Sequence, residues 1–219
     1  MTTARTGSGD AGFTDLLGHR RVAKYHPILE ALGEIDEATS ALGMAKAGLP
    51  EGEAHDLARG VIEAAQHDLY QLMAELAFPP QHAQARRIGE GDVQRLDAEI
   101  QRVQAAANVP ARFVLPGASR ESAGLDFARA VVRRAERAVV RVLHTGADDP
   151  AGDLLPDAAP QGDGREQVAG GGERQGDVDY PTSPSLAAYL NRLSLLLYVL
   201  ARYEDAVSGA TLRLAGSRA

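Results

Sequence analysis

Residues 112–146 read RFVLPGASRESAGLDFARAVVRRAERAVVRVLHTG, a short apolar run that turns through Pro116 and Gly117 into a long basic segment. In the basic segment, apolar residues recur every three or four positions, which is typical of a helix with one buried face. Ser119 precedes it as the expected N-cap. The expected buried face consists of Leu125, Ala128, Val132, Ala135, Val139 and Val142.

The other face of this predicted helix carries a stripe of arginines. Arg129, Arg133 and Arg137 follow one another at four-residue spacing, with Glu136 beside them. Guanidinium groups in register suit an anion that accepts paired hydrogen bonds, such as a polyphosphate. A solvated or subunit-facing stripe of ion pairs has the same spacing. The helix alone leaves both interpretations open.

Composition narrows the class of protein. The chain has 219 residues, 44% of them hydrophobic, so residues 1–219 are expected to form a single domain. A net charge of -7 argues against a nucleic-acid partner. The chain has no cysteine, and its six histidines show no zinc-binding spacing, so no metal site built by the protein is expected. The longest apolar run, residues 195–201, is too short to span a bilayer, so no membrane association is expected and the location is predicted to be cytoplasmic.

Glycine dominates the N-terminal segment, ARTGSGDAGFTDLLGHRRVAK at residues 4–24. We expect residues 1–26 to form a loop whose backbone N–H groups can approach a ligand, with a flexible tail as the alternative. The glycines also fit two common nucleotide-binding patterns, but no strand precedes them and the P-loop lysine is missing. Both patterns are therefore rejected, and Lys24 is the cation that remains downstream of the loop.

Four more helices are predicted from apolar periodicity and from cap and breaker residues. They are expected at residues 27–47, 53–78, 92–107 (with Asp92 as a cap) and 184–214 (with Ser183 as a cap). Between the basic helix and the last predicted helix, residues 147–182 are rich in Gly, Asp, Pro and Glu and are predicted to be a disordered insertion. The fold class is therefore all-α.

Several polar and aromatic side chains are open to two interpretations. Phe113 is either core filler or a wall, and its pattern favours core filler. Asn191 lies on the same predicted face as Tyr198 and Arg202, where it serves either a ligand or a core hydrogen bond. Asp36 is either a solvated residue or the partner of an arginine. His55 is expected to be an ordinary polar position.

Several segments, in this order along the chain, resemble the PduO-type ATP:corrinoid adenosyltransferases. They are RTG…DAGFT, Lys24 after RRV, EALGEIDEATSALG, FVLPG, ARAVVRRAER and YLNRLS…LAR. The resemblance covers nearly all of the chain except the insertion. It implies a five-helix bundle of the ferritin-like cobalamin adenosyltransferase type, assembled as a homotrimer, with ATP bound between the N-terminal loop of one subunit and the arginine helix of another.

The resemblance also implies roles for individual residues. Arg133, Arg137 and Phe113 are implied to act in catalysis, with Phe113 closing the lower face of the corrin. Asp36 and Arg129 are implied to form an intersubunit ion pair. The implied ATP contacts are Arg5, Thr6, Gly7, Thr14, Lys24, Arg133, Glu136, Arg137 and Asn191.

The implied reaction transfers the 5′-deoxyadenosyl group of ATP to the cobalt of reduced cobalamin or another corrinoid, with Mg²⁺ held mainly by the phosphates. The implied partners are a flavoprotein reductase and a B12-dependent mutase. Two other functions fit the same residues: an ATP-gated chaperone that delivers adenosylcobalamin, and a purely structural helical bundle.

The chain departs from the family pattern at four places. Ala4 stands where many relatives have Thr, and two extra residues widen the loop at Ser8 and Gly9. Leu195 replaces the usual Asp, and Asp126 replaces a common His. These departures bear more on the corrinoid contacts than on the ATP contacts, because the arginine, lysine and asparagine positions are all present.

Overall fold

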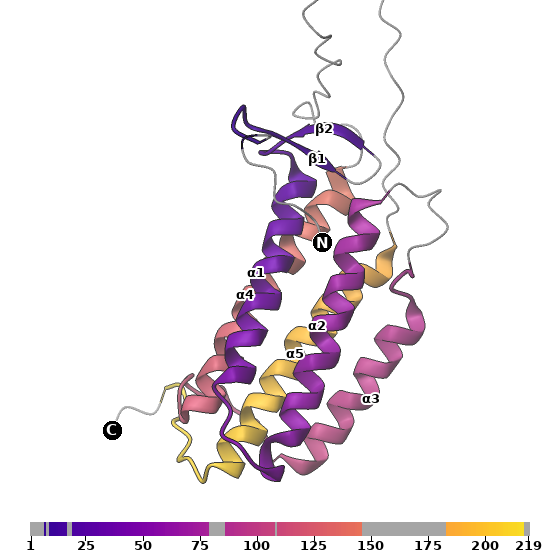
Figure 1. Cartoon of the computed structure of the whole chain (residues 1–219). Coiled ribbons are helices and arrows are strands. Elements are labelled where there is room, and N and C mark those ends of the chain that lie inside the picture. Colours follow the sequence, from indigo (N-terminus) through magenta and orange to yellow (C-terminus); the bar gives the residue numbers. More distant parts are fainter. Residues whose placement is uncertain are drawn as a thin grey trace, which may run out of the picture.

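The computed structural model describes residues 7, 9–16, 19–78, 86–107, 109–145 and 183–216. Within them, five α-helices run along a common axis, and a two-stranded hairpin lies at one end of the bundle (Figure 1). The helices are α1 (Pro27–Ala47), α2 (Asp56–Ala77), α3 (Glu90–Ala106), α4 (Arg120–Thr145) and α5 (Pro184–Val207). The predicted five-helix bundle is confirmed, and the hairpin is an addition to it.

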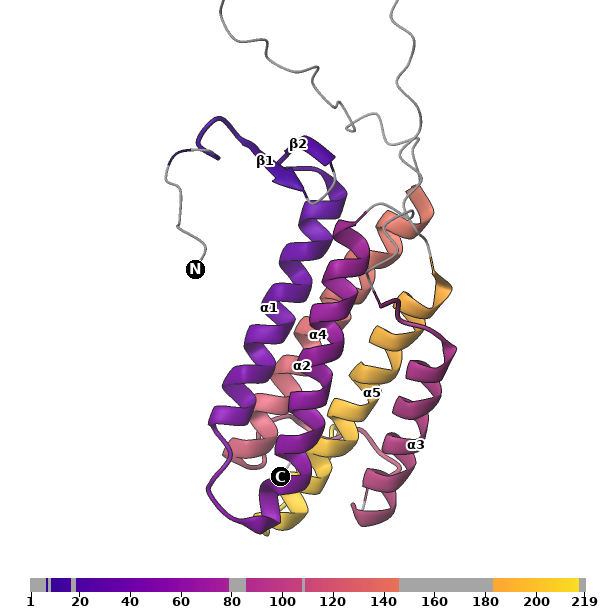
Figure 2. The ribbon, with the colours of Figure 1, turned by 45° about the vertical axis from the view of Figure 1, so that its right-hand side comes forward.

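Helix α4, which carries the arginine stripe, packs against both α1 and α5. Helix α5 also packs against α3, and α1 packs against α2, so α3 lies at an edge of the bundle (Figure 2). All the core residues expected on α4, from Leu125 to Val142, are buried. Ser119 caps this helix as predicted, since its Oγ accepts the Ser122 N–H at 3.0 Å. The arginine stripe is therefore carried by a firmly packed element.

The N-terminal segment contains a hairpin where only a loop was expected. Strand β1 (Phe13–Leu16) pairs antiparallel with β2 (His19–Ala23), with Phe13 opposite Ala23. The hairpin is held to the bundle because Leu16 and Val22 are buried against Ile28 of α1. The strands are short, and the surrounding glycines obscured their pattern.

Three helix ends also differ from the prediction. Helix α3 begins at Glu90, and Asp92 is its third residue rather than its N-cap. The Asp92 Oδ2 nevertheless accepts the Gly89 N–H at 3.1 Å, so it closes the first turn from inside the helix. Residues Glu53–His55 form a separate 3-10 turn, η1, before α2. Helix α5 begins at Pro184 with Ser183 as its cap, as expected, but ends at Val207, because Ser208 and Gly209 turn the chain away.

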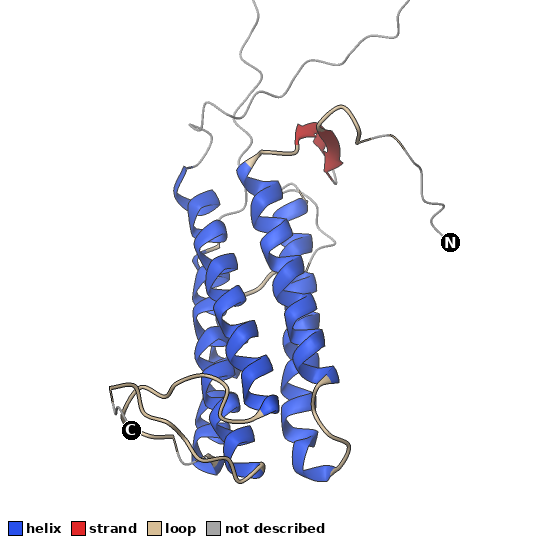
Figure 3. Ribbon diagram, turned by 90° about the vertical axis from the view of Figure 1, so that its left-hand side faces the viewer, coloured by secondary structure: helices blue, strands red, loops and turns tan. Residues whose placement is uncertain are grey.

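Beyond α5, the chain folds back as a tail that pairs with the apolar run before α4. Val114 and Leu214 form an antiparallel bridge, at the end of the bundle opposite the hairpin (Figure 3). The Leu115 N–H donates to the Arg213 carbonyl and the Ala215 N–H donates to the Phe113 carbonyl, both at 2.8 Å. This contact was not predicted, because the sequence pattern extended α5 through Leu214.

The predicted insertion at residues 147–182 lies outside the described residues, as do Ala4, Arg5, Thr6 and Ser8. No helix in the described part of the chain combines the length and the apolar character that a membrane span requires.

Candidate active site

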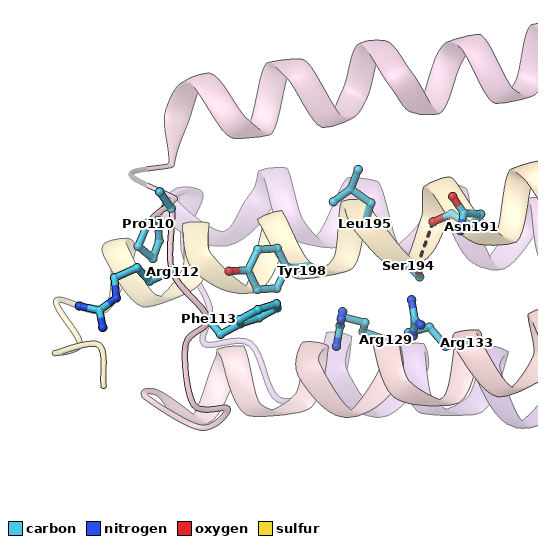
Figure 4. Close-up of a pocket in the computed structure, with 10 residues that line it drawn as sticks. Pro110, Arg112, Phe113, Arg129, Arg133, Asn191, Ser194, Leu195 and Tyr198 are labelled. Atoms are coloured by element: carbon cyan, nitrogen blue, oxygen red, sulfur yellow. Dashed lines mark hydrogen bonds between the residues drawn. The ribbon is translucent and has the colours of Figure 1, made fainter. Parts of the chain in front are cut away.

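Two hollows follow one another along α4 and share Arg133. The first, the Phe113 hollow, has a volume of about 460 Å³ (Figure 4). It is lined by Pro110, Ala111, Arg112, Phe113, Arg129, Arg133, Asn191, Ser194, Leu195 and Tyr198. The second, the Arg137 hollow, has a volume of about 560 Å³ and is lined by Arg133, Glu136, Arg137, Val140, Arg141 and His144. From Arg129 to His144 a helix rises by about 22 Å at 1.5 Å per residue, so the two hollows form one long track.

The track carries an excess of positive charge. Among the described residues, no carboxylate forms an ion pair with Arg129, Arg133 or Arg137. Arg134 differs, because its guanidinium donates to Glu34 and Glu37 of α1, and these hydrogen bonds raise its pKa. The arginines of α4 thus divide into a set neutralised by α1 and a set available to an anion from outside the chain.

Asn191 reaches this track from α5. Its Nδ2 donates to Glu136 Oε1 on α4 at 3.1 Å, and its Oδ1 accepts from Arg192 at 3.3 Å. The hydrogen bond to Glu136 links two helices, but Asn191 itself is exposed. Its polar atoms therefore face the Phe113 hollow rather than the core, which favours the ligand interpretation over the core hydrogen bond.

Phe113 is not core filler, so the interpretation favoured by its sequence pattern is wrong. The residue is 85% exposed, and its ring faces the hollow opposite Arg129 and near Tyr198 (Figure 4). Leu195, which is about half exposed, lines the same hollow. One end of the track therefore has an apolar wall, while the other end is lined by arginines. An exposed aromatic ring beside a hollow is typical of a binding surface.

Tyr198 lies between the Phe113 hollow and a buried group of charged side chains. The Arg129 guanidinium lies 5.7 Å from the centre of the Tyr198 ring, and the Arg202 guanidinium lies 5.3 Å from it. Arg202 is only 2% exposed and donates to Asp126 and Asp205, both at 2.8 Å. The Asp126 departure from the family pattern therefore has a structural explanation: its carboxylate neutralises a buried arginine.

His55 and Glu204 form a second buried pair, which no sequence pattern predicted. The prediction that His55 is an ordinary polar position is wrong, because it is buried and lies 2.6 Å from Glu204 Oε2. Burial raises the pKa of Glu204, and the hydrogen bond and charge of His55 oppose that shift only in part. Arg202, Asp126 and Asp205 thus form one buried group, the Arg202 cluster, while the neighbouring Glu204 pairs with His55.

Three of the implied ATP contacts in the N-terminal segment are among the described residues, and they lie apart from the track of the same chain. Gly7, Thr14 and Lys24 are described, but none of them lines either hollow. Gly9 lies close to Lys24, since a Cβ built on Gly9 would come within 2.9 Å of Lys24 Nζ. The extra residue at this position therefore bounds the space that the lysine side chain occupies.

The predicted pair of Asp36 and Arg129 is not formed within one chain. Asp36 is exposed on α1, whereas Arg129 stacks beside Tyr198 on the α5 side of α4. Because the pair is predicted to join two subunits, a single chain does not test it.

The described residues contain no group of three or more His, Cys, Asp or Glu side chains that could hold a metal ion. Glu136 is the carboxylate that lines the track. The track therefore offers cations and one carboxylate, a donor set that suits phosphates far better than a metal ion bound by protein alone.

The fold and the site together define a class: a helical bundle with an arginine track for an anionic ligand next to an apolar-walled hollow. The model of the cobalamin adenosyltransferase family matches residues 4–155, which include the arginine stripe and Phe113. The chain belongs to the cobalamin adenosyltransferase family.

Named relatives agree with this assignment. A corrinoid adenosyltransferase of Mycobacterium tuberculosis is 33% identical over 100% of this chain and 96% of its own length. A cobalamin adenosyltransferase of Cupriavidus metallidurans is 32% identical over 96% of this chain and 92% of its own. The corrinoid adenosyltransferase PduO of Salmonella typhimurium is 32% identical over 91% of this chain, which spans only about half (49%) of that longer protein.

Solved structures show the same fold. A variant of the PduO-type ATP:corrinoid adenosyltransferase of Lactobacillus reuteri, complexed with ATP, has a TM-score of 0.74 at 22% identity, covering 97% of this chain and 99% of that one. Another variant of that protein, complexed with cobalamin and ATP, has a TM-score of 0.73 at 21% identity, with the same coverage of both chains.

Proposed function

We propose that this chain is a corrinoid adenosyltransferase, a transferase that moves the 5′-deoxyadenosyl group of ATP to the cobalt of reduced cobalamin or another corrinoid and releases triphosphate. The observation that carries the proposal is the shared Arg133, where an arginine-lined hollow meets an apolar-walled one. A reaction between a polyphosphate ester and a large, partly apolar macrocycle needs these two environments side by side.

The reaction needs no nucleophile from the protein. Cobalt in its Co(I) state attacks C5′ of ATP with its own electron pair, the C5′–O bond breaks, and triphosphate leaves with the bonding electrons. The protein's tasks are to align the two reactants and to stabilise the charge that develops on the leaving group. Arg133 and Arg137, which have no carboxylate partner among the described residues, supply that charge stabilisation. Glu136 holds Asn191 toward the nucleotide.

The apolar wall serves the corrinoid. We assign Phe113 to the lower face of the corrin, where its ring keeps water and the lower base away from cobalt, with Tyr198 and Leu195 beside it. Its high exposure supports this role, because an exposed ring has a free face to offer a ligand.

We propose that the complete site forms between subunits of a homotrimer. The hairpin with Lys24 does not line the track of its own chain, so Arg5, Thr6, Gly7, Thr14 and Lys24 would reach the track of a neighbour.

The α1/α4 face of the bundle offers an apolar surface for such an interface. Met44 of α1 is 71% exposed and Phe127 of α4 is 55% exposed. A Cβ built on Gly124 would come within 3.2 Å of Ala45, so these two turns lie against each other. Exposed apolar side chains on adjacent helices are typical of a contact surface, and the proposed pair of Asp36 and Arg129 would join the same two subunits.

Mixing two inactive variants tests the shared site. Lys24→Ala and Arg137→Ala chains, each inactive alone, should regain part of their activity when they are unfolded and refolded together, because mixed trimers contain some sites with both residues intact. Recovery no greater than in separately refolded controls would contradict a site shared between subunits.

Magnesium would be held mainly by the triphosphate, since the track contributes a single carboxylate. The expected partners are a flavoprotein reductase that supplies electrons and a B12-dependent mutase that receives the product, in the cytoplasm. Measuring triphosphate and adenosylcobalamin with ATP in large excess over protein separates an enzyme, which makes many products per site, from a delivery chaperone, which stops at one.

A further inference from the structure

The C-terminal tail, residues 208–216, lines neither the Phe113 hollow nor the Arg137 hollow. It follows α5, the helix that carries Asn191 and Tyr198, and then runs beside the segment that carries Phe113 (Figure 3). Two main-chain hydrogen bonds of 2.8 Å flank the bridge between Val114 and Leu214. One of them is accepted by the carbonyl of Phe113 itself.

The side chain of Phe113 contributes little to holding this residue in place, because it is not packed in the core. Its ring is 85% exposed, and its neighbours Arg112 and Leu115 are exposed as well. The segment is bounded by Pro110 and by a turn at Gly117, whose φ is 87°. An extended segment without buried side chains is held mainly by its main-chain hydrogen bonds. The two bonds to the tail are therefore well placed to fix the position of the ring.

The start of the tail is held by hydrogen bonds to the last turn of α5. The Ala210 N–H donates to the Asp205 carbonyl at 2.8 Å, and the Ser208 N–H donates to the Glu204 carbonyl at 2.9 Å. Asp205 is a buried member of the Arg202 cluster, and Glu204 is buried and paired with His55. A continuous path of bonds thus runs from the buried cluster through the tail to the main chain of Phe113.

We propose that the tail residues 211–215 are a positioning element for Phe113: the Ala215 N–H and the Arg213 carbonyl hold the Phe113 segment so that its ring stands at the wall of the hollow. None of the described residues 211–216 is buried, so the tail adds little to the core. The consequence for cobalt chemistry rests on the proposed function, whereas the positioning itself does not.

The test removes one donor. Ala215→Pro deletes the N–H that the Phe113 carbonyl accepts, and Ala215→Ser is the matched control, since serine keeps that N–H. Amide hydrogen exchange at Leu115, measured without any corrinoid, should become about fivefold faster in Ala215→Pro, the factor to which one ordinary hydrogen bond converts. The control should exchange like the parent protein.

The functional readout compares two states of cobalt. Ala215→Pro should slow product formation from cob(II)alamin plus a reductant more than formation from chemically prepared cob(I)alamin, with the KM for ATP unchanged. A tail with only a structural role would lower both rates equally. A chain that ends at Ala210 is a second variant. It removes both hydrogen bonds, including the acceptor of the Leu115 N–H, so Leu115 should exchange faster still and the rate ratio should change in the same direction, although no described buried residue is lost.

The two proposals fail in different ways. If Leu115 exchanges at the parent rate in both variants, or if the ratio of the two cobalt rates is unchanged, the tail does not position Phe113. If the parent protein forms no alkylcobalamin from cob(I)alamin, the proposed function is wrong, and the exchange measurement still decides whether the tail holds the Phe113 segment.

Discussion

Arg137 and Arg202 both belong to helices that pack against each other, yet they stand in opposite electrostatic situations. Arg202 is buried and donates to two carboxylates, Asp126 and Asp205. Arg137 is exposed beside a hollow, and its Nη1 donates to the carbonyl of Arg133 in its own helix. A buried charge is tolerated only when it is paired, whereas an exposed cation without an anionic partner can accept one from outside. The chain therefore neutralises the buried arginine, and it leaves the exposed arginine, which we propose binds the ligand, without a carboxylate partner among the described residues.

The largest expected effect is the loss of stability that follows when the buried Arg202 is replaced. Arg202→Met should lower the free energy of unfolding by about 3 to 5 kcal/mol, because it leaves Asp126 and Asp205 buried without a cation. Arg137→Met should change it by less than about 0.5 kcal/mol, as is usual for an exposed position. Denaturant unfolding of both variants measures the difference, and equal losses would contradict the division into two kinds of arginine.

A change at the exposed Arg137 should affect the use of ATP rather than the stability of the fold. Arg137→Lys should lower kcat/KM for ATP at least about tenfold, equivalent to about 1.5 kcal/mol, because an ammonium group cannot reproduce two parallel hydrogen bonds to phosphate. Arg134→Lys is the matched control, since the neighbouring Arg134 pairs with Glu34 and Glu37 and should leave ATP kinetics unchanged. Normal ATP kinetics in folded Arg137→Lys protein would return the stripe to a structural role.

Phe113→Ala tests the apolar end of the track. Because the ring is 85% exposed, its removal should shift the unfolding free energy by less than about 1 kcal/mol, far below the 3 to 5 kcal/mol typical of a buried Phe. The KM for ATP should stay unchanged, and the rate from cob(II)alamin should fall more than the rate from cob(I)alamin. A large drop in Tm with equal losses from the two cobalt states would restore the core-filler interpretation.

The buried pair of His55 and Glu204 should affect the pH dependence of stability. Burial raises the pKa of Glu204 in the folded state above its ordinary value, so its contribution to stability is present at low pH and is lost as pH rises through the raised pKa. The Tm of Glu204→Gln relative to the parent protein should therefore rise as pH increases above the ordinary pKa of a glutamate.

Asp92→Asn should show the opposite trend. Burial alone would raise the Asp92 pKa, but the Gly89 N–H and the arginines Arg95 and Arg86 together lower it below 3.8. The parent's advantage over this variant should therefore be present above about pH 3.8 and disappear as pH falls. Parallel pH profiles for the Glu204 and Asp92 variants would show that at least one of the two groups does not couple to folding as described.

The smallest expected effect is at Gly9. Gly9→Ala should displace the flexible end of Lys24, because the new Cβ would lie within 2.9 Å of Nζ, without forcing the backbone to move. We expect the KM for ATP to rise by roughly threefold, a fraction of one charge-assisted hydrogen bond, at an unchanged Tm. An unchanged KM would show that the extra loop residue does not influence Lys24.

The sequence predicted those parts of the molecule that depend on long periodic patterns. The buried face of α4, its Ser119 cap and the arginine stripe follow directly from three- and four-residue spacing. The hairpin and the true end of α5 were missed, because short strands among glycines and a polar turn at Ser208 carry weak local signals. His55 and Glu204 are 149 residues apart, and only the packed bundle brings them together. For Phe113 the resemblance indicated a wall, whereas its own pattern favoured core filler, because an isolated Phe among aliphatic residues is usually buried.

One measurement tests the central claim that the Arg137 hollow and the Phe113 hollow are the two halves of a transferase site. The parent protein is mixed without oxygen with ATP, Mg²⁺ and chemically reduced cob(I)alamin, and the absorption spectrum is followed. We expect the cob(I)alamin spectrum to be replaced by that of an alkylcobalamin, with one triphosphate released per product and many turnovers per site. A cob(I)alamin spectrum that persists in the presence of folded protein and ATP would contradict the account.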